Sequence, residues 1–233
     1  MNKAWHIILG SASPRRKELL AELDLTFEVD ARTNFEERIP EGLSCEEIPR
    51  YLAEGKSRGF HRPLEPDELL ITADTLVFLG TEALGKPRDR EDAVRMLREL
   101  SGKAHTVTTG VCIRTGSPLS HDSLNFHGHP GSPLSSDSPG CPDFSGLSGA
   151  PGLSGSPAME SFTDTSLVYF AELTDADIAY YVDRYQPYDK AGAYGIQEWI
   201  GAAAITRIEG SYYNVMGLPT APLWSHLKKY LHK

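Results

Sequence analysis

Two adjacent arginines stand where the sequence predicts the start of a helix, in the segment GSASPRRKELL at residues 10–20. Ser13 is a good N-cap and a proline follows it, so Arg15 and Arg16 fall in the first helical turn. The helix dipole favours acidic side chains in that turn, whereas its free N–H groups attract anions. Arginine also holds phosphate oxygens well, and the Ser11 hydroxyl lies nearby. The pattern indicates an anion-binding site, with a surface helix bearing two exposed arginines as an equally weighted alternative.

A carboxylate lies within the most apolar predicted strand, ELLITADTLVFLG at residues 68–80. Asp74 falls between Ile71 and Val77, and burying a lone charge there would be too costly. Such an acid is paired, binds a metal or takes part in a reaction. The alternative is an aspartate at a strand end that accepts backbone N–H bonds. Thr75 follows Asp74 and places a hydroxyl at the same edge.

Other polar side chains become candidate site residues only when they are considered together with the paired arginines and Asp74. Lys86 lies in the tight turn GKP, Lys56 on a predicted helix, and Glu37 in the acidic stretch NFEERIP. Taken alone, these three are most simply a solvated surface. The segment YDKAGAYGIQEW at residues 188–199 combines Gln197 with small residues, which indicate a close approach of the backbone to a ligand or to another element.

The sequence contains no phosphate loop of the GxxxxGK type, no GxGxxG after a strand and no GxSxG turn. What remains is a group of cations, at least two acids and a helix start suited to phosphate. This set fits a metal-assisted reaction at a polyphosphate, in which the neutralisation of charge supplies most of the rate.

Strands and helices alternate along the chain, which predicts an α/β fold, and we expect residues 1–233 to form a single domain. We expect strands over residues 5–10, 27–30, 68–80, 104–115 and 161–173, and helices that begin at residue 14 and that span 45–60, 89–100 and 174–185. A strand, a glycine turn and a closing helix are expected in residues 202–233.

The stretch at residues 116–160 breaks this alternation. It consists mostly of glycine, serine and proline and contains no lysine or arginine, so it buries too little surface to offset its ordering entropy. We predict a flexible insertion between two paired strands. Its His121, His127, His129 and Cys141 match no zinc-binding spacing and are expected to be solvated loop residues.

Composition and charge exclude several classes of protein. The 233 residues are 40% hydrophobic and 24% charged, as in an ordinary globular protein, and the formal charge of −9 argues against a general nucleic-acid binder. Three scattered cysteines make neither a disulfide framework nor a CxxC metal site, which favours a reducing cytoplasm. The N-terminal apolar run is too short for a signal peptide, and no segment reaches membrane-spanning length. We therefore expect a cytoplasmic protein with no nucleic-acid or membrane partner.

In their order along the chain, several segments resemble the sequence blocks of the Maf nucleotide pyrophosphatases. The resemblance covers nearly all of the chain except the insertion, and the ordered set is far more specific than any one block. The blocks are GSASPRRKELL, LAEGKSRGF, ITADTLV, GKP, HTVTTGV, and YDKAGAYGIQ followed by GSYYNVMGLP.

This resemblance implies a fold and an activity. The fold would be α/β and related to that of the inosine triphosphate pyrophosphatases, with a mixed twisted sheet, flanking helices and a cleft between two lobes. The activity would be cleavage of a nucleoside triphosphate to the monophosphate and pyrophosphate with a divalent metal, expected to be Mg²⁺, with Mn²⁺ or Co²⁺ as substitutes. The resemblance also suggests a homodimer.

The family's functional residues carry over by motif. Asp74 would orient or deprotonate the attacking water and would bind the metal together with Glu37. The phosphates would be held by Ser11, Arg15, Arg16, Lys56 and Lys86. Three residues match the positions that mark the branch acting on dTTP and UTP: Arg15, Thr75 and Gln197. The amide of Gln197 offers a donor and an acceptor to a pyrimidine edge.

The chain departs from the family pattern in two places, and two alternative functions stay open. Ala12 stands where the family has glycine, and the long insertion is atypical. One alternative is a nucleotide-binding regulator of cell division or septum formation with little turnover. The other is a pyrophosphatase for a modified purine such as 7-methyl-GTP. The proposed site requires that the paired arginines and Asp74 face one common cleft.

Overall fold

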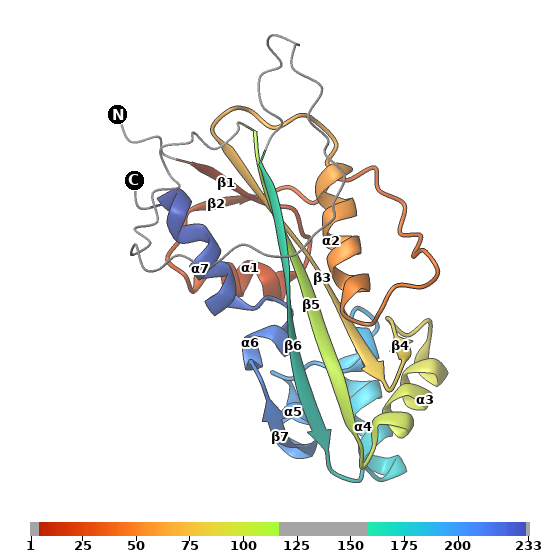
Figure 1. Ribbon diagram of the computed structural model, residues 1–233. Coiled ribbons are helices and arrows are strands. Elements are labelled where there is room, and N and C mark those ends of the chain that lie inside the picture. The colour runs from red at the N-terminus through yellow and green to blue at the C-terminus, as the bar shows by residue number, and fades with distance from the viewer. Residues whose placement is uncertain (1–4, 117–157, 232–233) are drawn as a thin grey trace, which may run out of the picture.

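The computed structural model of the chain describes residues 5–116 and 158–231. Within these residues, seven strands form one mixed sheet with helices on both faces (Figure 1). The strands are β1 (His6–Leu9), β2 (Phe27–Val29), β3 (Glu68–Leu79), β4 (Glu82–Leu84), β5 (Ala104–Thr115), β6 (Met159–Phe170) and β7 (Ile205–Glu209). Their order is β2-β1-β3-β5-β6-β7, with β4 paired to β3. The pairs β1–β2 and β1–β3 are parallel and the remaining pairs antiparallel, which confirms the predicted mixed α/β sheet.

Three of the predicted helices begin where their capping residues place them. The helices are α1 (Pro14–Ala21), α2 (Glu47–Arg58), α3 (Arg90–Leu100), α4 (Asp175–Tyr185), α5 (Trp199–Ala204), α6 (Tyr212–Met216) and α7 (Thr220–Leu231), with a 3₁₀ turn, η2 (Ala191–Ala193). Ser13 and Asp89 cap α1 and α3 with their side chains, and Thr174 forms a capping box with Asp177. Among the helices described, none combines the length and the apolar character that a bilayer span needs.

The boundaries differ from the prediction mainly beside the insertion. β6 begins at Met159 rather than at residue 161, because Met159 and Glu160 pair with β5. The predicted insertion at residues 116–160 therefore ends earlier, and residues 117–157, which include the three histidines and Cys141, lie outside the described residues. The short α5, α6 and η2 were not predicted, because helices of fewer than two turns leave no periodic pattern to read.

One edge of β3 is open at its centre. β5 pairs with one side of β3 along most of its length, while β1 pairs with the other side at residues 68–71 and β4 at residues 77–79. On that second side, no strand of the described residues pairs with residues 72–76. Asp74 and Thr75 thus lie in a gap of the sheet, where side chains from both faces can reach the same space.

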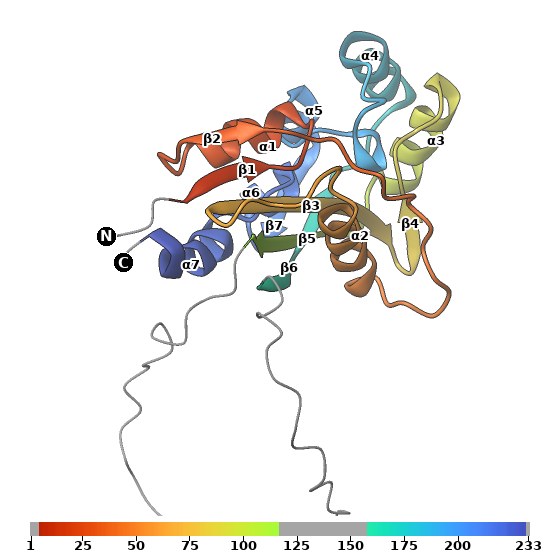
Figure 2. The ribbon, with the colours of Figure 1, turned by 90° about the horizontal axis from the view of Figure 1, so that it is seen from above.

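The two large apolar clusters of the core meet at this gap, and a third, smaller one contains Ile8, Phe60 and Leu70. In Figures 1 and 2, α1 and α7 lie beside β1 and β2, whereas α3 and α4 lie together at the far end of the long strands. Ala73 of β3 belongs to the cluster with α1 and α7, and Val77 belongs to the cluster with α3 and α4. The half-buried residues 74–76 lie between them. These clusters correspond to the two predicted lobes.

Candidate active site

A cavity of about 680 Å³ opens at the gap, where β1 and β2 end beside the middle of β3. Ligands of α/β proteins commonly bind at the carboxyl ends of parallel strands. The walls of the cavity contain every residue that the sequence predicts to bind or react: Ser11, Arg15, Arg16, Glu37, Lys56, Asp74, Thr75, Lys86 and Gln197. The prediction that the arginines of α1 and Asp74 share one cleft is confirmed.

Asp74 has the partner that a buried carboxylate requires. Its Oδ1 forms an ion pair with Nζ of Lys56 from α2, and the same ammonium lies 2.8 Å from Oε1 of Glu37. The side chains of Asp74 and Lys56 are only 14% and 18% exposed. A lysine, rather than a set of backbone N–H groups, is therefore the partner that the structure gives to this acid.

Two glycines bring the partners of Asp74 into reach. A Cβ on Gly110 of β5 would lie 2.3 Å from the backbone nitrogen of Arg50, so the glycine allows α2 to pack directly on the sheet. A Cβ on Gly55 of α2 would lie 2.3 Å from the ring of Phe35. That ring holds the segment carrying Glu37 against α2. Lys56 and Glu37 are thereby positioned by packing and not only by charge.

Asp74 and Glu37 fit a metal that arrives with its ligand. Within the described residues, no group of three or more His, Cys, Asp or Glu side chains is placed to hold a metal. Mg²⁺ is commonly bound by one or two carboxylates, with waters and substrate phosphates completing its shell. The two carboxylates already converge on one cation, the Lys56 ammonium. They therefore suit a divalent ion whose other ligands are phosphate oxygens.

Arg16 is a partly buried residue that links several elements through hydrogen bonds, rather than an exposed cation. Its Nε donates to Gly217 O at 2.8 Å, Nη1 to Ala73 O at 2.9 Å and Nη2 to Thr75 Oγ1 at 2.9 Å. A longer contact of 3.3 Å joins Nη1 to Ser11 Oγ. Burial lowers the pKa of Arg16, although an arginine remains protonated at neutral pH. The sequence predicts that Arg16 binds phosphate, whereas most donors of its guanidinium already bond to oxygens of the protein.

Arg15 keeps most of its donors for the cavity. Its Nη1 donates to Asp189 Oδ2 at 2.8 Å, and it makes no second hydrogen bond to a described residue. Successive residues of a helix point about 100° apart, so Arg15 and Arg16 face different surroundings. Asp189 was missed in the sequence, because the two partners are 174 positions apart and nothing local to either marks the pairing.

Lys86 and Gln197 are exposed on the cavity wall and make no hydrogen bond with the part of the chain that is described. Their backbones are fastened together, because the N–H of Gly192 donates to the carbonyl of Gly85 at 3.0 Å. The neighbouring wall is apolar and consists of Val77, Val107, Ala191, Tyr194, Val215 and Met216. The cavity therefore offers one charged wall and one apolar wall to a ligand.

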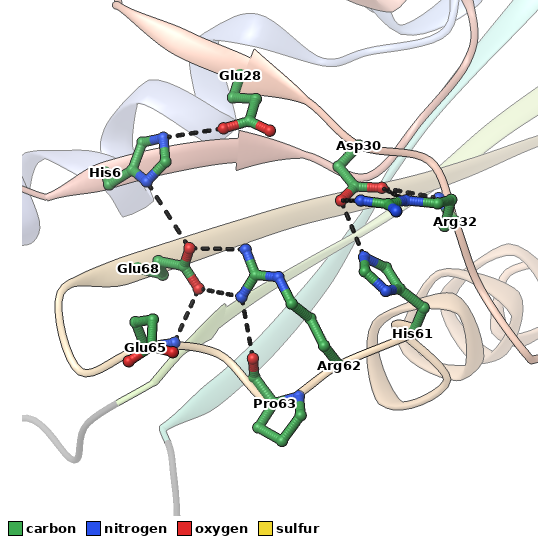
Figure 3. A network of polar contacts seen from close by, with 9 residues as sticks. All are labelled: His6, Glu28, Asp30, Arg32, His61, Arg62, Pro63, Glu65 and Glu68. Atoms are coloured by element: carbon green, nitrogen blue, oxygen red, sulfur yellow. Dashed lines mark hydrogen bonds and ion pairs between the residues drawn. The ribbon is translucent and has the colours of Figure 1, made fainter.

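A second buried carboxylate, Asp30, lines the cavity at the end of β2, and its role was not predicted. Figure 3 shows it between Arg32 and His61: Arg32 donates from Nε and Nη2 at 2.9 and 2.7 Å, and His61 Nε2 lies 2.9 Å away. Chiefly the Arg32 hydrogen bonds hold the pKa of Asp30 far below its usual range. An acid at the end of a predicted strand, two residues before an arginine, was the available signal. The cluster fixes the start of the segment that leads to Glu37.

Comparison with known proteins places these residues in a family context. The family model described as "Maf-like protein" matches residues 6–128 and 149–230. A dTTP/UTP pyrophosphatase of Porphyromonas gingivalis is 45% identical over 230 residues, covering 98% of this chain and 96% of that protein. Proteins of the same name from Phocaeicola vulgatus and Bacteroides thetaiotaomicron are each 42% identical over 225 residues, covering 97% of this chain and 96% of theirs.

The contrast between the two arginines gives a test. Arg16→Ala removes hydrogen bonds to β3 and to the turn before α7, so we expect the free energy of unfolding to fall by about 3 kcal/mol. Arg15→Ala breaks one ion pair at the cavity surface, for which we expect a loss of less than about 1 kcal/mol. Urea denaturation followed by tryptophan fluorescence measures both. An equal loss of unfolding free energy in the two variants would contradict the structural role assigned to Arg16.

Proposed function

The chain belongs to the Maf family, and we propose that it hydrolyses dTTP and UTP to the nucleoside monophosphate and pyrophosphate. One observation carries this proposal: the Asp74–Lys56–Glu37 cluster, Arg15 of α1 and an apolar wall all face one cavity. A triphosphate fits the charged wall and a pyrimidine fits the apolar wall. The relatives named dTTP/UTP pyrophosphatase support the same substrate class.

In this proposal the phosphates bind where cations meet the start of α1. The start of α1 offers the backbone N–H of Arg15 and the Ser11 hydroxyl, and the side chains of Arg15 and Lys86 add full charges. Arginine can hold two phosphate oxygens at once, whereas lysine acts as a point charge. These groups stabilise negative charge that develops on the phosphate oxygens as the reaction proceeds. Arg16 contributes by fixing Thr75 and the start of α1.

Asp74 is the proposed general base. Its carboxylate orients a water molecule and accepts its proton while the water oxygen bonds to the α-phosphorus. The bond from the α-phosphorus to the oxygen bridging to the β-phosphorus then breaks, and pyrophosphate leaves with the electron pair. Lys56 holds the carboxylate in place from the side of α2. Glu37 and Asp74 would hold a divalent metal, Mg²⁺ or in its place Mn²⁺ or Co²⁺, which would neutralise phosphate charge.

Gln197 and Thr75 are the proposed base-recognition residues. Gln197 is exposed at the cavity wall, so its amide can donate to and accept from a pyrimidine edge. The Thr75 hydroxyl is fixed by Arg16 and by Thr109, whose Oγ1 lies 2.9 Å away. A cytoplasmic location and a homodimer are proposed from the composition and the family resemblance; light scattering on the purified protein tests the dimer.

Asp74→Asn tests the general base. We expect pyrophosphate release from dTTP to fall about a thousandfold, because the amide cannot accept the proton, while nucleotide binding persists. Asp183→Asn is the matched control: like Asp74, Asp183 forms an ion pair, in its case with Arg90, but it lies outside the cavity wall and its substitution should leave the rate unchanged. Equal, negligible turnover by the natural protein and by Asp74→Asn, with nucleotide still bound, would instead favour the regulatory protein.

Metal removal tests the proposed role of Glu37 and Asp74. We expect EDTA to lower dTTP hydrolysis at least a hundredfold and Mg²⁺ to restore it, because two carboxylates and the phosphates must be neutralised together. Glu37→Gln should raise the Mg²⁺ concentration needed for half-maximal rate, as measured by titration. Full activity in EDTA would contradict the metal site.

The substrate class is tested by comparing dTTP, UTP and 7-methyl-GTP at equal concentration. We expect the two pyrimidine nucleotides to be preferred, and Gln197→Ala to reduce that preference about tenfold, since the lost amide leaves base polar groups unpaired. The ratio of kcat/KM values measures the preference. A higher kcat/KM for 7-methyl-GTP in the natural protein would assign the chain to the purine branch.

A further inference from the structure

One ion pair joins the two lobes directly across the cavity. Arg15 belongs to α1, whose Leu19 and Leu20 pack in the first apolar cluster. Asp189 lies two residues before η2, which packs through Ala193 in the cluster with α3 and α4. The 2.8 Å bond between Arg15 Nη1 and Asp189 Oδ2 therefore spans the mouth of the site.

Asp189 is held from behind by a chain of buried polar groups. Its other oxygen, Oδ1, accepts from Lys190 Nζ at 2.8 Å, and the same ammonium lies 3.0 Å from Glu198 Oε1. Glu198 accepts a hydrogen bond from the hydroxyl of the fully buried Tyr181, and this hydroxyl accepts from Gly195 N–H at 3.0 Å. Lys190 is only 9% exposed. The position of Asp189 is thus set by the segment that carries Gln197.

This segment also sets the other groups on its side of the cavity. Gly192 has a φ of +67°, and a Cβ there would lie 3.0 Å from Val77. Its N–H bonds to the carbonyl of Gly85, next to Lys86. Arg15, Lys86 and Gln197 are therefore all positioned by one stretch of chain, residues 189–198.

A carboxylate at this place works against the binding of an anion. Burial opposes the ionisation of Asp189, but the hydrogen bonds from Lys190 and Arg15 outweigh it and keep its pKa below the usual value. A charged acid beside a triphosphate repels it, so electrostatics alone predicts that removing Asp189 would strengthen nucleotide binding. The presence of Asp189 therefore needs another explanation, and its hydrogen bond with Arg15 provides one.

We propose that Asp189 is a positioning residue: it orients Arg15 toward the phosphates and ties that orientation to the Gln197 segment. This inference rests on the proposed function, because it concerns the same nucleotide site. Arg15 uses one donor nitrogen on Asp189, and its Nε and Nη2 are left for phosphate oxygens. Without Asp189, the arginine is free to leave the cavity, and the phosphate wall loses its preorganised cation.

A double-mutant cycle on kcat/KM for dTTP tests the proposal. We expect Arg15→Ala to lose about a hundredfold and Asp189→Ala about tenfold, as for charge-assisted contacts. Because Asp189 acts through Arg15, the double variant should stay within about twofold of Arg15→Ala alone. Asp189→Asn, which can still accept from Arg15, should recover part of the loss. Losses that multiply in the double variant, or tighter binding by Asp189→Ala, would overturn the proposal.

The cycle separates this proposal from the proposed function. If the natural protein does not hydrolyse dTTP, the function fails, and the same cycle is measured on the Kd of dTTP with an α,β-imido bridge. Asp183→Ala serves as the control here, since it breaks an exposed arginine pair between α3 and α4 and should change neither constant. Thermal melting of each variant excludes unfolding, and Lys190→Met should reproduce the Asp189→Ala defect. A normal kcat/KM for Lys190→Met would contradict the link to the Gln197 segment.

Discussion

The site depends on one constraint, a carboxylate placed in the middle of an apolar strand. A lone buried charge costs several kcal/mol, and only a partner at good geometry offsets it. Lys56 meets this need because α2 packs on β5 at Gly110, where a side chain would strike the helix backbone. Replacing the pair by apolar residues would keep a stable strand, so its presence points to chemistry rather than to folding. The packing of α2 is therefore part of the site.

A short first strand turns this constraint into a cavity. β1 pairs with β3 only as far as Ile71, and β4 resumes pairing at Val77. Asp74 points toward α2 while Thr75 points toward Arg16, because neighbouring strand residues face opposite sides. In a fully paired sheet these two side chains would lie in separate layers. The gap between β1 and β4 lets both reach one ligand, and Arg16 satisfies the edge carbonyl of Ala73 that the gap leaves open.

Local pattern predicted most of the fold, and the resemblance of the sequence motifs to a family predicted which residues line the cavity, but neither predicted the contacts within the site. Strand alternation and caps such as Ser13 depend on neighbours in sequence, so they could be read directly. The different roles of Arg15 and Arg16 could not be predicted, because they depend on acceptors contributed by Asp189 and Gly217. The role of Asp30 was missed for the same reason, since its partner His61 follows α2 and lies 31 positions further along the chain. Side-chain partners distant in sequence leave no periodic signal.

A cavity for an anion that also contains four acids has a physical logic. The acids Asp30, Glu37, Asp74 and Asp189 hold Arg32, Lys56 and Arg15 in fixed positions. Each pair lowers the attraction for a free anion, because part of the positive charge is already neutralised. In return the cations are ordered before the ligand arrives, so little reorganisation remains for the reaction itself. Fixed dipoles and charges aimed at developing charge favour the transition state over the ground state, and this difference is what accelerates a reaction.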